Sequence, residues 1–440
     1  MGLFFPLLFA AVIGMKAQDT VHFSLAEALA FAVENNLNAE NARIDVAIAD
    51  QRVWEATASG LPQVNASVNY NYNINLATTL IPDFLGDPSD KIEVQFGTKH
   101  FATAGLVGNQ LIFSGEFIIG LQASRIFREF TQRNKERTEQ EVRQTVMQNY
   151  YLVLLGENTL DALNGNLKNV QSSFEETREL LKAGFVEEID ADQLEVTVTA
   201  LQNSVLSMER QVVATKNLLK YQMGLDREHV IQLTDSLQDL VRQIDFEASL
   251  NAPFDLEENI DYQILNEQER LALMDLKLKR TEYMPTLSAF YSLDYTAQRD
   301  EFNFLDRNES WFEASVVGLS LNVPIFSSGL RRAGVAQKRL AFEQAQNNKV
   351  FASKGLEVEF QQAKYDFANA LEQYRAERRN LELSEKVVSV TRQKYDEGLA
   401  SSLELTQVND QYINTLREYT TVMVDVLNAK IRIDLLLNNI

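Results

Sequence analysis

Polar and apolar residues alternate for over a dozen positions after Pro62, and the alternation returns after Pro285. Successive side chains of a β-strand point to opposite faces, so each stretch predicts a strand with one apolar and one polar face. After Pro62 the apolar positions are Val64, Ala66, Val68, Tyr70, Tyr72, Ile74 and Leu76, against Gln63, Asn65, Ser67, Asn69, Asn71, Asn73 and Asn75. After Pro285 they are Leu287, Ala289, Tyr291, Leu293 and Tyr295, against Ser288, Ser292 and Asp294.

Each of these strands is expected to pair with a return strand, at about 101–113 and about 311–325. Polar loops rich in turn residues separate the partners, at 82–90 in the first pair and 299–309 in the second. In a soluble sheet the apolar face would cover a core and the polar face would meet water. In a membrane barrel the apolar face meets lipid, and the amide-rich face lines a wet lumen.

Long stretches without proline follow both hairpins. Residues 115–252 and 325–440 contain none of the seven prolines, as an uninterrupted helix requires. We therefore predict helices at about 115–183 and 330–397, each on the order of 100 Å long at about 1.5 Å per residue. In the last segment, three- and four-residue spacing is typical of a coiled-coil seam. Its members are Leu405, Val408, Tyr412, Thr415, Tyr419, Val422, Val426, Ala429, Ile433 and Leu436.

The chain carries the same motifs twice, in the same order. Gly60–Val64 corresponds to Tyr283–Leu287, Asn109–Gly115 to Asn322–Gly329, and Leu181–Phe185 to Tyr395–Leu399. Each copy predicts a helix, a hairpin, a long helix, a turn and a second long helix. Residues 18–440 are therefore expected to form a single fold built from two structural repeats, at about 20–225 and 255–440.

The N-terminus contains an apolar run, Leu3–Ile13, followed by a short segment ending at Ala17. This run is shorter than the roughly 20 residues of a membrane-spanning helix and fits a signal peptide, predicted at 1–17. No later segment has 18 uninterrupted apolar residues. If the chain spans a membrane, we expect strands to do so. Because the chain has no cysteine, a lipoprotein anchor on a mature N-terminal cysteine is not expected.

Composition excludes several classes of function. With 62 acidic against 41 basic residues and a net charge of −21, the chain lacks the basic surface that nucleic-acid binding needs. The three histidines, His22, His100 and His229, have no second histidine at helical metal-binding spacing. Neither a phosphate-binding glycine loop nor a nucleophile elbow occurs. We therefore predict no catalytic residue, no cofactor and no metal site.

Four strands per chain cannot close a barrel around a lumen. Open strand edges in lipid leave backbone N–H and C=O groups unpaired, at a cost of several kcal/mol each. Two copies would give an eight-stranded barrel, and side chains fill the interior of a barrel of that size. Three copies would give twelve strands and leave an open lumen. The sequence therefore predicts an oligomer, and a conducting one needs at least three copies.

These features together resemble the TolC-like outer membrane efflux protein family (outer membrane factors), along nearly the whole chain from Ser24. The resemblance rests on the opening helix that runs into Asn35-Asn36, the strand exits at 112–115 and 325–329, and the paired glycine turns. It implies a mainly α fold with a transmembrane β-barrel. Long antiparallel coiled-coil helices would form an α-barrel below a trimeric 12-stranded β-barrel, with four strands from each subunit. An equatorial region is expected near 225–260.

The resemblance also implies a periplasmic tip at the two glycine turns, where family members contact an adaptor protein. A glycine that merely ends one helix before the next begins would leave the same pattern, so both roles stay open. The matching positions are Gly184, Phe185, Val186, Gly398, Leu399 and Ala400.

Acidic residues follow both turns, where the family carries inward carboxylates that constrict the entrance and select cations. The expected gate residues are Asp190, Asp192, Glu187 and Glu404. The helix dipole alone also favours acids at helix N-termini, which is the alternative explanation. The family's prototype holds its tip shut with an arginine in the second turn, but here that position is Ala400.

The function implied is a trimeric outer-membrane exit duct of a tripartite efflux or type I secretion system. Its partners would be a periplasmic adaptor, an inner-membrane pump of the RND or ABC type, and outer-membrane lipid, with no nucleic acid. The protein would lie in the cell outer membrane and extend into the periplasm. The alternative is a soluble periplasmic coiled-coil scaffold without channel activity.

Overall fold

The computed structural model describes residues 20–82 and 91–440, so the predicted signal peptide at 1–17 lies outside the described residues. The chain folds as two compact units. Unit 1 contains Met1–Asp45, Gln132–Leu265 and Val350–Ile440, and unit 2 contains Val46–Thr131 and Asn266–Lys349. Within the described ranges, no helix is long and apolar enough to cross a membrane.

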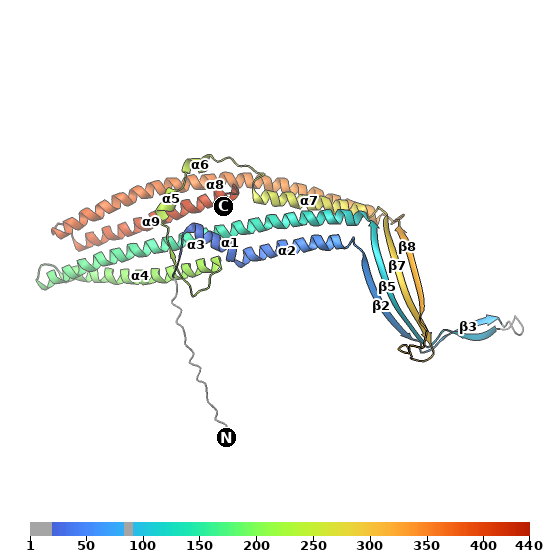
Figure 1. The fold of residues 1–440 in the computed structure, drawn as a ribbon. Coiled ribbons are helices and arrows are strands. Elements are labelled where there is room, and N and C mark those ends of the chain that lie inside the picture. The colour runs from blue at the N-terminus through green and yellow to red at the C-terminus, as the bar shows by residue number, and fades with distance from the viewer. Residues whose placement is uncertain (1–19, 83–90) are drawn as a thin grey trace, which may run out of the picture. The chain divides into compact units, whose positions relative to one another are not determined.

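The fold is mainly helical, with a few strands (Figure 1). The two longest helices, α3 (Gly115–Lys182) and α8 (Leu330–Asp396), confirm the predicted bounds to within a residue. The helices are α1 (Leu25–Asn35), α2 (Leu37–Ala58), α3, α4 (Glu188–Met223), α5 (Leu237–Arg242), α6 (Phe246–Asn251), α7 (Ile260–Thr281), α8 and α9 (Ser402–Leu436). The strands are β1 (Thr20–Phe23), β2 (Gln63–Tyr72), β3 (Ala77–Pro82), β4 (Lys91–Phe96), β5 (His100–Phe113), β6 (Val230–Leu233), β7 (Thr286–Arg299) and β8 (Phe312–Asn322).

In unit 1 the helices pack along the seams that the sequence predicts. On α3 and α4, apolar residues at three- and four-residue spacing form one buried cluster: Leu163, Val170, Leu194, Val198, Leu201 and Val205. On α9 the seam is buried at Leu405, Tyr419, Val422, Val426, Ile433 and Leu436. Between these positions, Tyr412 and Thr415 stay half-buried. The burial confirms coiled-coil packing as the force that holds these long helices side by side.

The N-terminal strand β1 pairs in parallel with β6, which lies in the segment expected near 225–260. Tyr150 of α3, fully buried, holds this pairing to the helices. Its hydroxyl lies 3.0 Å from both the carbonyl oxygen of Phe23 and Oδ2 of Asp235. The same Oδ2 accepts the N–H of Leu25, at 2.6 Å. One carboxylate thus joins the start of α1, the chain after β6, and α3.

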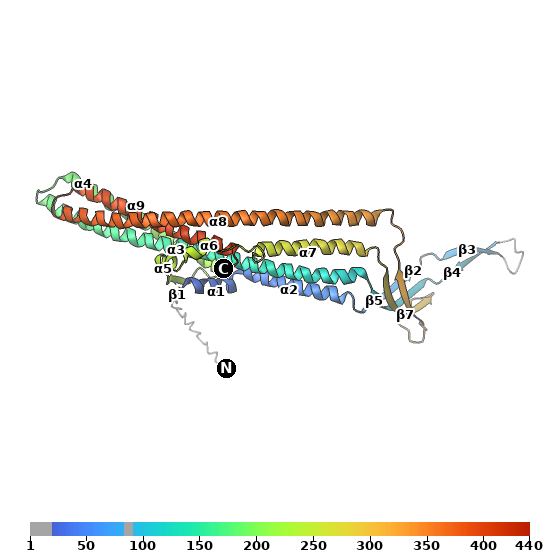
Figure 2. The same cartoon turned by 90° about the horizontal axis from the view of Figure 1, so that it is seen from above.

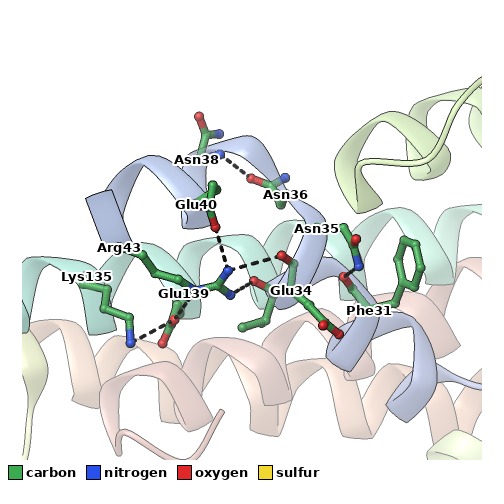
Figure 3. Close-up of polar contacts among 10 residues, drawn as sticks. Phe31, Glu34, Asn35, Asn36, Asn38, Glu40, Arg43, Lys135 and Glu139 are labelled. Carbon is green, nitrogen blue, oxygen red and sulfur yellow. Dashed lines mark hydrogen bonds and ion pairs between the residues drawn. The ribbon is translucent and has the colours of Figure 1, made fainter. Parts of the chain in front are cut away.

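Between α1 and α2 the chain turns at Asn36, and the turn is held by side chains (Figure 3). Arg43 donates to the last carbonyl groups of α1, at Val33 and Glu34, which have no partner inside the helix. Asn36, almost fully buried, accepts the N–H of Asn38 and donates to the carbonyl of Gln222 on α4, at 2.8 and 2.7 Å. These contacts explain why an asparagine, Asn36, directly follows the first helix.

Unit 2 contains a four-stranded antiparallel sheet in the order β2-β5-β7-β8. The predicted alternation ran to Leu76, but β2 ends at Tyr72. A second hairpin, β3–β4, lies between the end of β2 and the start of β5 and extends beyond the end of the sheet (Figure 2). The polar loop expected at 82–90 lies, apart from Pro82, outside the described residues. After the Asn73–Lys99 hydrogen bond, residues 74–76 lie opposite only 97–98, and Gly97 takes a φ of 105°. This extra residue interrupts the ladder as a bulge does.

Replacing Tyr150 by Phe tests the buried contact in unit 1. The variant removes one buried hydroxyl and its hydrogen bond to the Phe23 carbonyl. This loss should lower the unfolding free energy by about 1–2 kcal/mol. Tyr365→Phe, at an exposed position of α8, should change stability by less than about 0.5 kcal/mol. Urea unfolding followed by circular dichroism measures both, and equal midpoints would contradict the assigned role of Tyr150.

The same site predicts a pH dependence. Burial, followed by the nearby Asp235 carboxylate, raises the pKa of Tyr150 above its usual value. A phenol whose pKa is raised in the folded state stabilises the protein below its unfolded pKa of about 10, and this contribution is lost as pH rises further. Between about pH 10 and 12, the unfolding free energy of Tyr150→Phe should therefore fall less steeply than that of the unchanged chain.

Candidate functional site

Both helical hairpins of unit 1 turn at a glycine, and the two turns lie at the same end of the unit (Figure 1). Gly184 and Gly398 have φ values of 77° and 72°, in the left-handed region that favours glycine. In each turn the residue after glycine donates its N–H back into the preceding helix, from Phe185 to Leu180 at 3.0 Å and from Leu399 to Lys394 at 2.7 Å. Both turns therefore end their helices with the same glycine-based motif.

The residues after the two glycines present apolar side chains to solvent. Phe185 is 78% exposed and Leu399 is 73% exposed, while Val186 and Ala400 are half-buried. A pair of large exposed apolar residues on neighbouring turns is the kind of surface that a partner helix covers. The structure thus brings all six predicted tip positions together at one end of unit 1.

The four predicted gate acids lie at the starts of α4 and α9, in the same region. Glu187 precedes α4, and the Asp190 carboxylate accepts the Glu187 N–H at 3.3 Å. Asp192 is exposed, and Glu404 lies exposed in the first turn of α9. Negative charge at these positions interacts favourably with the partial positive charge of a helix N-terminus. Part of the acidic pattern therefore has a local structural role, as the alternative explanation expected.

Two hydrogen bonds that were not predicted join the hairpins near their turns. Ser402 of α9 donates to Oδ1 of Asp190 on α4, at 3.1 Å. The Thr177 hydroxyl of α3 lies 2.6 Å from the Tyr395 hydroxyl of α8. No sequence pattern pointed to them, because their partners are 212 and 218 residues apart along the chain. They join the hairpins beside Ala400, where the family's prototype has an arginine.

The sheet of unit 2 has the two unlike faces that the alternation predicts. The strand register places Ala66, Leu106, Leu293 and Ser315 in one row, and the rows on either side of it carry further apolar residues. Most large side chains on this face are exposed: Val64, Val68, Leu106, Tyr291, Val317, Leu319 and Leu321. The opposite face carries most of the asparagine, serine and threonine of these strands, together with apolar residues such as Phe101, Phe290 and Val316. A single chain therefore leaves an apolar sheet face uncovered.

The sheet also has two open edges. In the described part of the chain, β2 pairs only with β5 and β8 pairs only with β7. Each edge strand therefore presents a row of backbone donors and acceptors that can accept another strand.

Aromatic side chains gather where β2 and β5 approach the loop after β7. Tyr70 and His100 share a hydrogen bond of 2.8 Å, and Phe302 and Phe304 pack edge-on against Tyr70 with ring centroids 5.6 and 5.8 Å away. Aromatic residues, Tyr and Trp above all, are enriched at the membrane–water interfaces of membrane barrels. Among the described residues, no three His, Cys, Asp or Glu side chains are grouped to hold a metal ion.

Removing both bonds between the hairpins should loosen the turns. In a Ser402→Ala/Tyr395→Phe double variant, we expect amide hydrogen exchange near the two turns to rise by roughly thirty-fold, the effect of losing two bonds of about 1 kcal/mol each. Ser204→Ala is a matched control, because the Ser204 hydroxyl donates to the Ala200 carbonyl of its own helix and does not join the two hairpins. If control and double variant exchange alike, these bonds do not hold the hairpins together.

Comparison with known proteins agrees with this geometry. A model of the outer membrane efflux protein family matches residues 29–225 and 256–439. The proteases secretion protein PrtF of Dickeya chrysanthemi is 23% identical over 301 residues, which cover 68% of this chain and 64% of that protein. The chain thus matches less than two thirds of the length of this relative.

Solved structures show the same fold. The Vibrio cholerae outer membrane protein VceC superposes with a TM-score of 0.71 at 12% identity, over 94% of this chain and 95% of that chain. The Campylobacter jejuni CmeC outer membrane channel superposes with a TM-score of 0.72 at 15% identity, over 94% of this chain and 85% of that chain. At such identities, the likeness concerns the fold.

Proposed function

The chain belongs to the outer membrane efflux protein family, and we propose that it forms the trimeric outer-membrane exit duct of a tripartite efflux or type I secretion system. The duct conducts substrates from an inner-membrane pump across the periplasm and the outer membrane. The relatives named as secretion and channel proteins support this function. The energy comes from the pump, and the chain itself catalyses no reaction.

A two-faced sheet with two open edges is the observation behind this function. In lipid, β2 of one copy must pair with β8 of the next, because unpaired backbone groups there are too costly. Three copies then close a 12-stranded barrel with its apolar face toward lipid and its amide-rich face around a lumen. The long helices continue the duct as an α-barrel.

The alternative, a soluble periplasmic scaffold, leaves this sheet unexplained. In water, the exposed apolar face and the two open edges would promote aggregation. Coiled-coil helices alone would serve a scaffold equally well, so unit 2 distinguishes the two functions. In a membrane, lipid would cover the apolar face, and the edge strands would pair with those of neighbouring copies.

The glycine turns of unit 1 are the proposed contact with the periplasmic adaptor, through Phe185 and Leu399. The acids Glu187, Asp190, Asp192 and Glu404 form the proposed cation-selective entrance. With Ala400 in place of an arginine, the Ser402–Asp190 and Thr177–Tyr395 bonds hold the two hairpins together in the closed state. Adaptor binding opens the tip by separating them.

The oligomer and its conductance test this function directly. Three 50.0-kDa chains should give a particle of about 150 kDa in detergent after subtraction of the micelle. The purified protein should also conduct ions in planar bilayers, with a preference for cations. A monomer without conductance, recovered in the soluble fraction, would instead support the scaffold.

Adaptor contact is tested by a Phe185→Ala/Leu399→Ala double variant. Truncating two exposed apolar residues at the centre of an interface should weaken adaptor co-purification at least ten-fold, as losses of more than about 1.4 kcal/mol do. Tyr221→Ala is the control, because Tyr221 is similarly exposed, at 74%, at the other end of α4. Equal losses in both variants would exclude the turns as the specific contact.

A further inference from the structure

The polar face of the unit 2 sheet carries one ionisable side chain, Asp294 of β7. This count covers β2, β5, β7 and β8 within their described bounds, with residues assigned to the face by the strand register. The other members of the face are neutral: Gln63, Asn65, Ser67, Asn69 and Asn71 of β2; Phe101, Thr103, Gly105, Val107, Asn109 and Leu111 of β5; Thr286, Ser288, Phe290, Ser292, Thr296 and Gln298 of β7; and Phe312, Ala314, Val316, Gly318, Ser320 and Asn322 of β8.

The residues around Asp294 leave its carboxylate without a partner of opposite charge. In its row, Asp294 pairs with Gly105 on one side and Ala314 on the other, and Ser67 lies beyond Gly105. A Cβ on Gly105 would lie 2.3 Å from Oδ1 of Asp294, so the carboxylate rests over the glycine. The described residues place no lysine or arginine in an ion pair with it. None of the described residues therefore neutralises its negative charge.

We propose that Asp294 lines the barrel lumen and sets a preference for cations there, separately from the acids at the tip. This inference rests on the proposed trimeric barrel, in which each copy contributes one Asp294 to a ring of three carboxylates at one level. The neighbouring side chains in the row are small, so the carboxylates are the main groups that a passing ion meets at that level.

A ring of negative charges in a pore with a low-dielectric wall raises the local concentration of cations and lowers that of anions. Because the lumen is wet, mobile ions screen this effect over about 10 Å at 0.1 M salt and about 3 Å at 1 M. The preference due to Asp294 should therefore be strong in dilute salt and weak in concentrated salt.

The test compares reversal potentials of single channels in a KCl gradient. In Asp294→Asn channels, the ratio of potassium to chloride permeability should fall roughly three-fold near 0.1 M salt and much less near 1 M. Glu313→Gln is a matched control that removes the same charge one residue pair away, on the opposite face. There Glu313 accepts a hydrogen bond from Tyr295, at 2.9 Å, and its loss should leave the ratio unchanged.

The absence of cysteine from the chain allows a second test in the assembled channel. Asp294→Cys channels treated with a sulfonate-bearing methanethiosulfonate should regain cation preference, whereas a trimethylammonium-bearing reagent should shift the preference toward chloride. Channels that conduct as trimers but show no change with Asp294→Asn or with either reagent would overturn this inference and leave the duct standing. If the wild-type protein neither trimerises nor conducts, the proposed duct function itself would be overturned.

Discussion

Backbone hydrogen bonding at the edges of the four-stranded sheet is the constraint on which the proposed assembly depends. In water, an open edge can be satisfied by solvent, but in lipid each unpaired N–H or C=O group costs several kcal/mol. The β2 and β8 edges of one chain can satisfy each other only across copies. The number of copies then decides whether the closed barrel is filled or open.

The helices meet a different constraint, because neighbouring helices share no backbone hydrogen bonds and must be held together by their side chains. Seams on α3, α4 and α9 bury apolar residues along much of their length, and coiled-coil packing can extend over any length that the seam covers. Side-chain contacts also fix both ends of the shorter helix α1. The Asp235 carboxylate binds the start of α1, and Arg43 binds its last carbonyls.

Much of this fold could be predicted from the sequence, because the deciding signals are local. Proline positions and apolar spacing predicted α3 and α8 closely, and alternation predicted both faces of the sheet. The β3–β4 hairpin could not be predicted, because a bulge depends on how many residues lie opposite on another strand. The Ser402–Asp190 bond could not be predicted either, since it joins residues 212 positions apart.

The chemistry of these tip contacts bears on how the proposed gate would respond to its surroundings. An arginine–carboxylate pair is a charge-assisted contact whose strength falls with salt when it is exposed. Here Ala400 removes that possibility, and a hydroxyl–carboxylate bond and a hydroxyl–hydroxyl bond join the hairpins instead. Each is worth on the order of 1 kcal/mol, and neither joins two opposite charges whose attraction salt would screen. A gate held in this way would open through displacement by a partner rather than through a change in ionic strength.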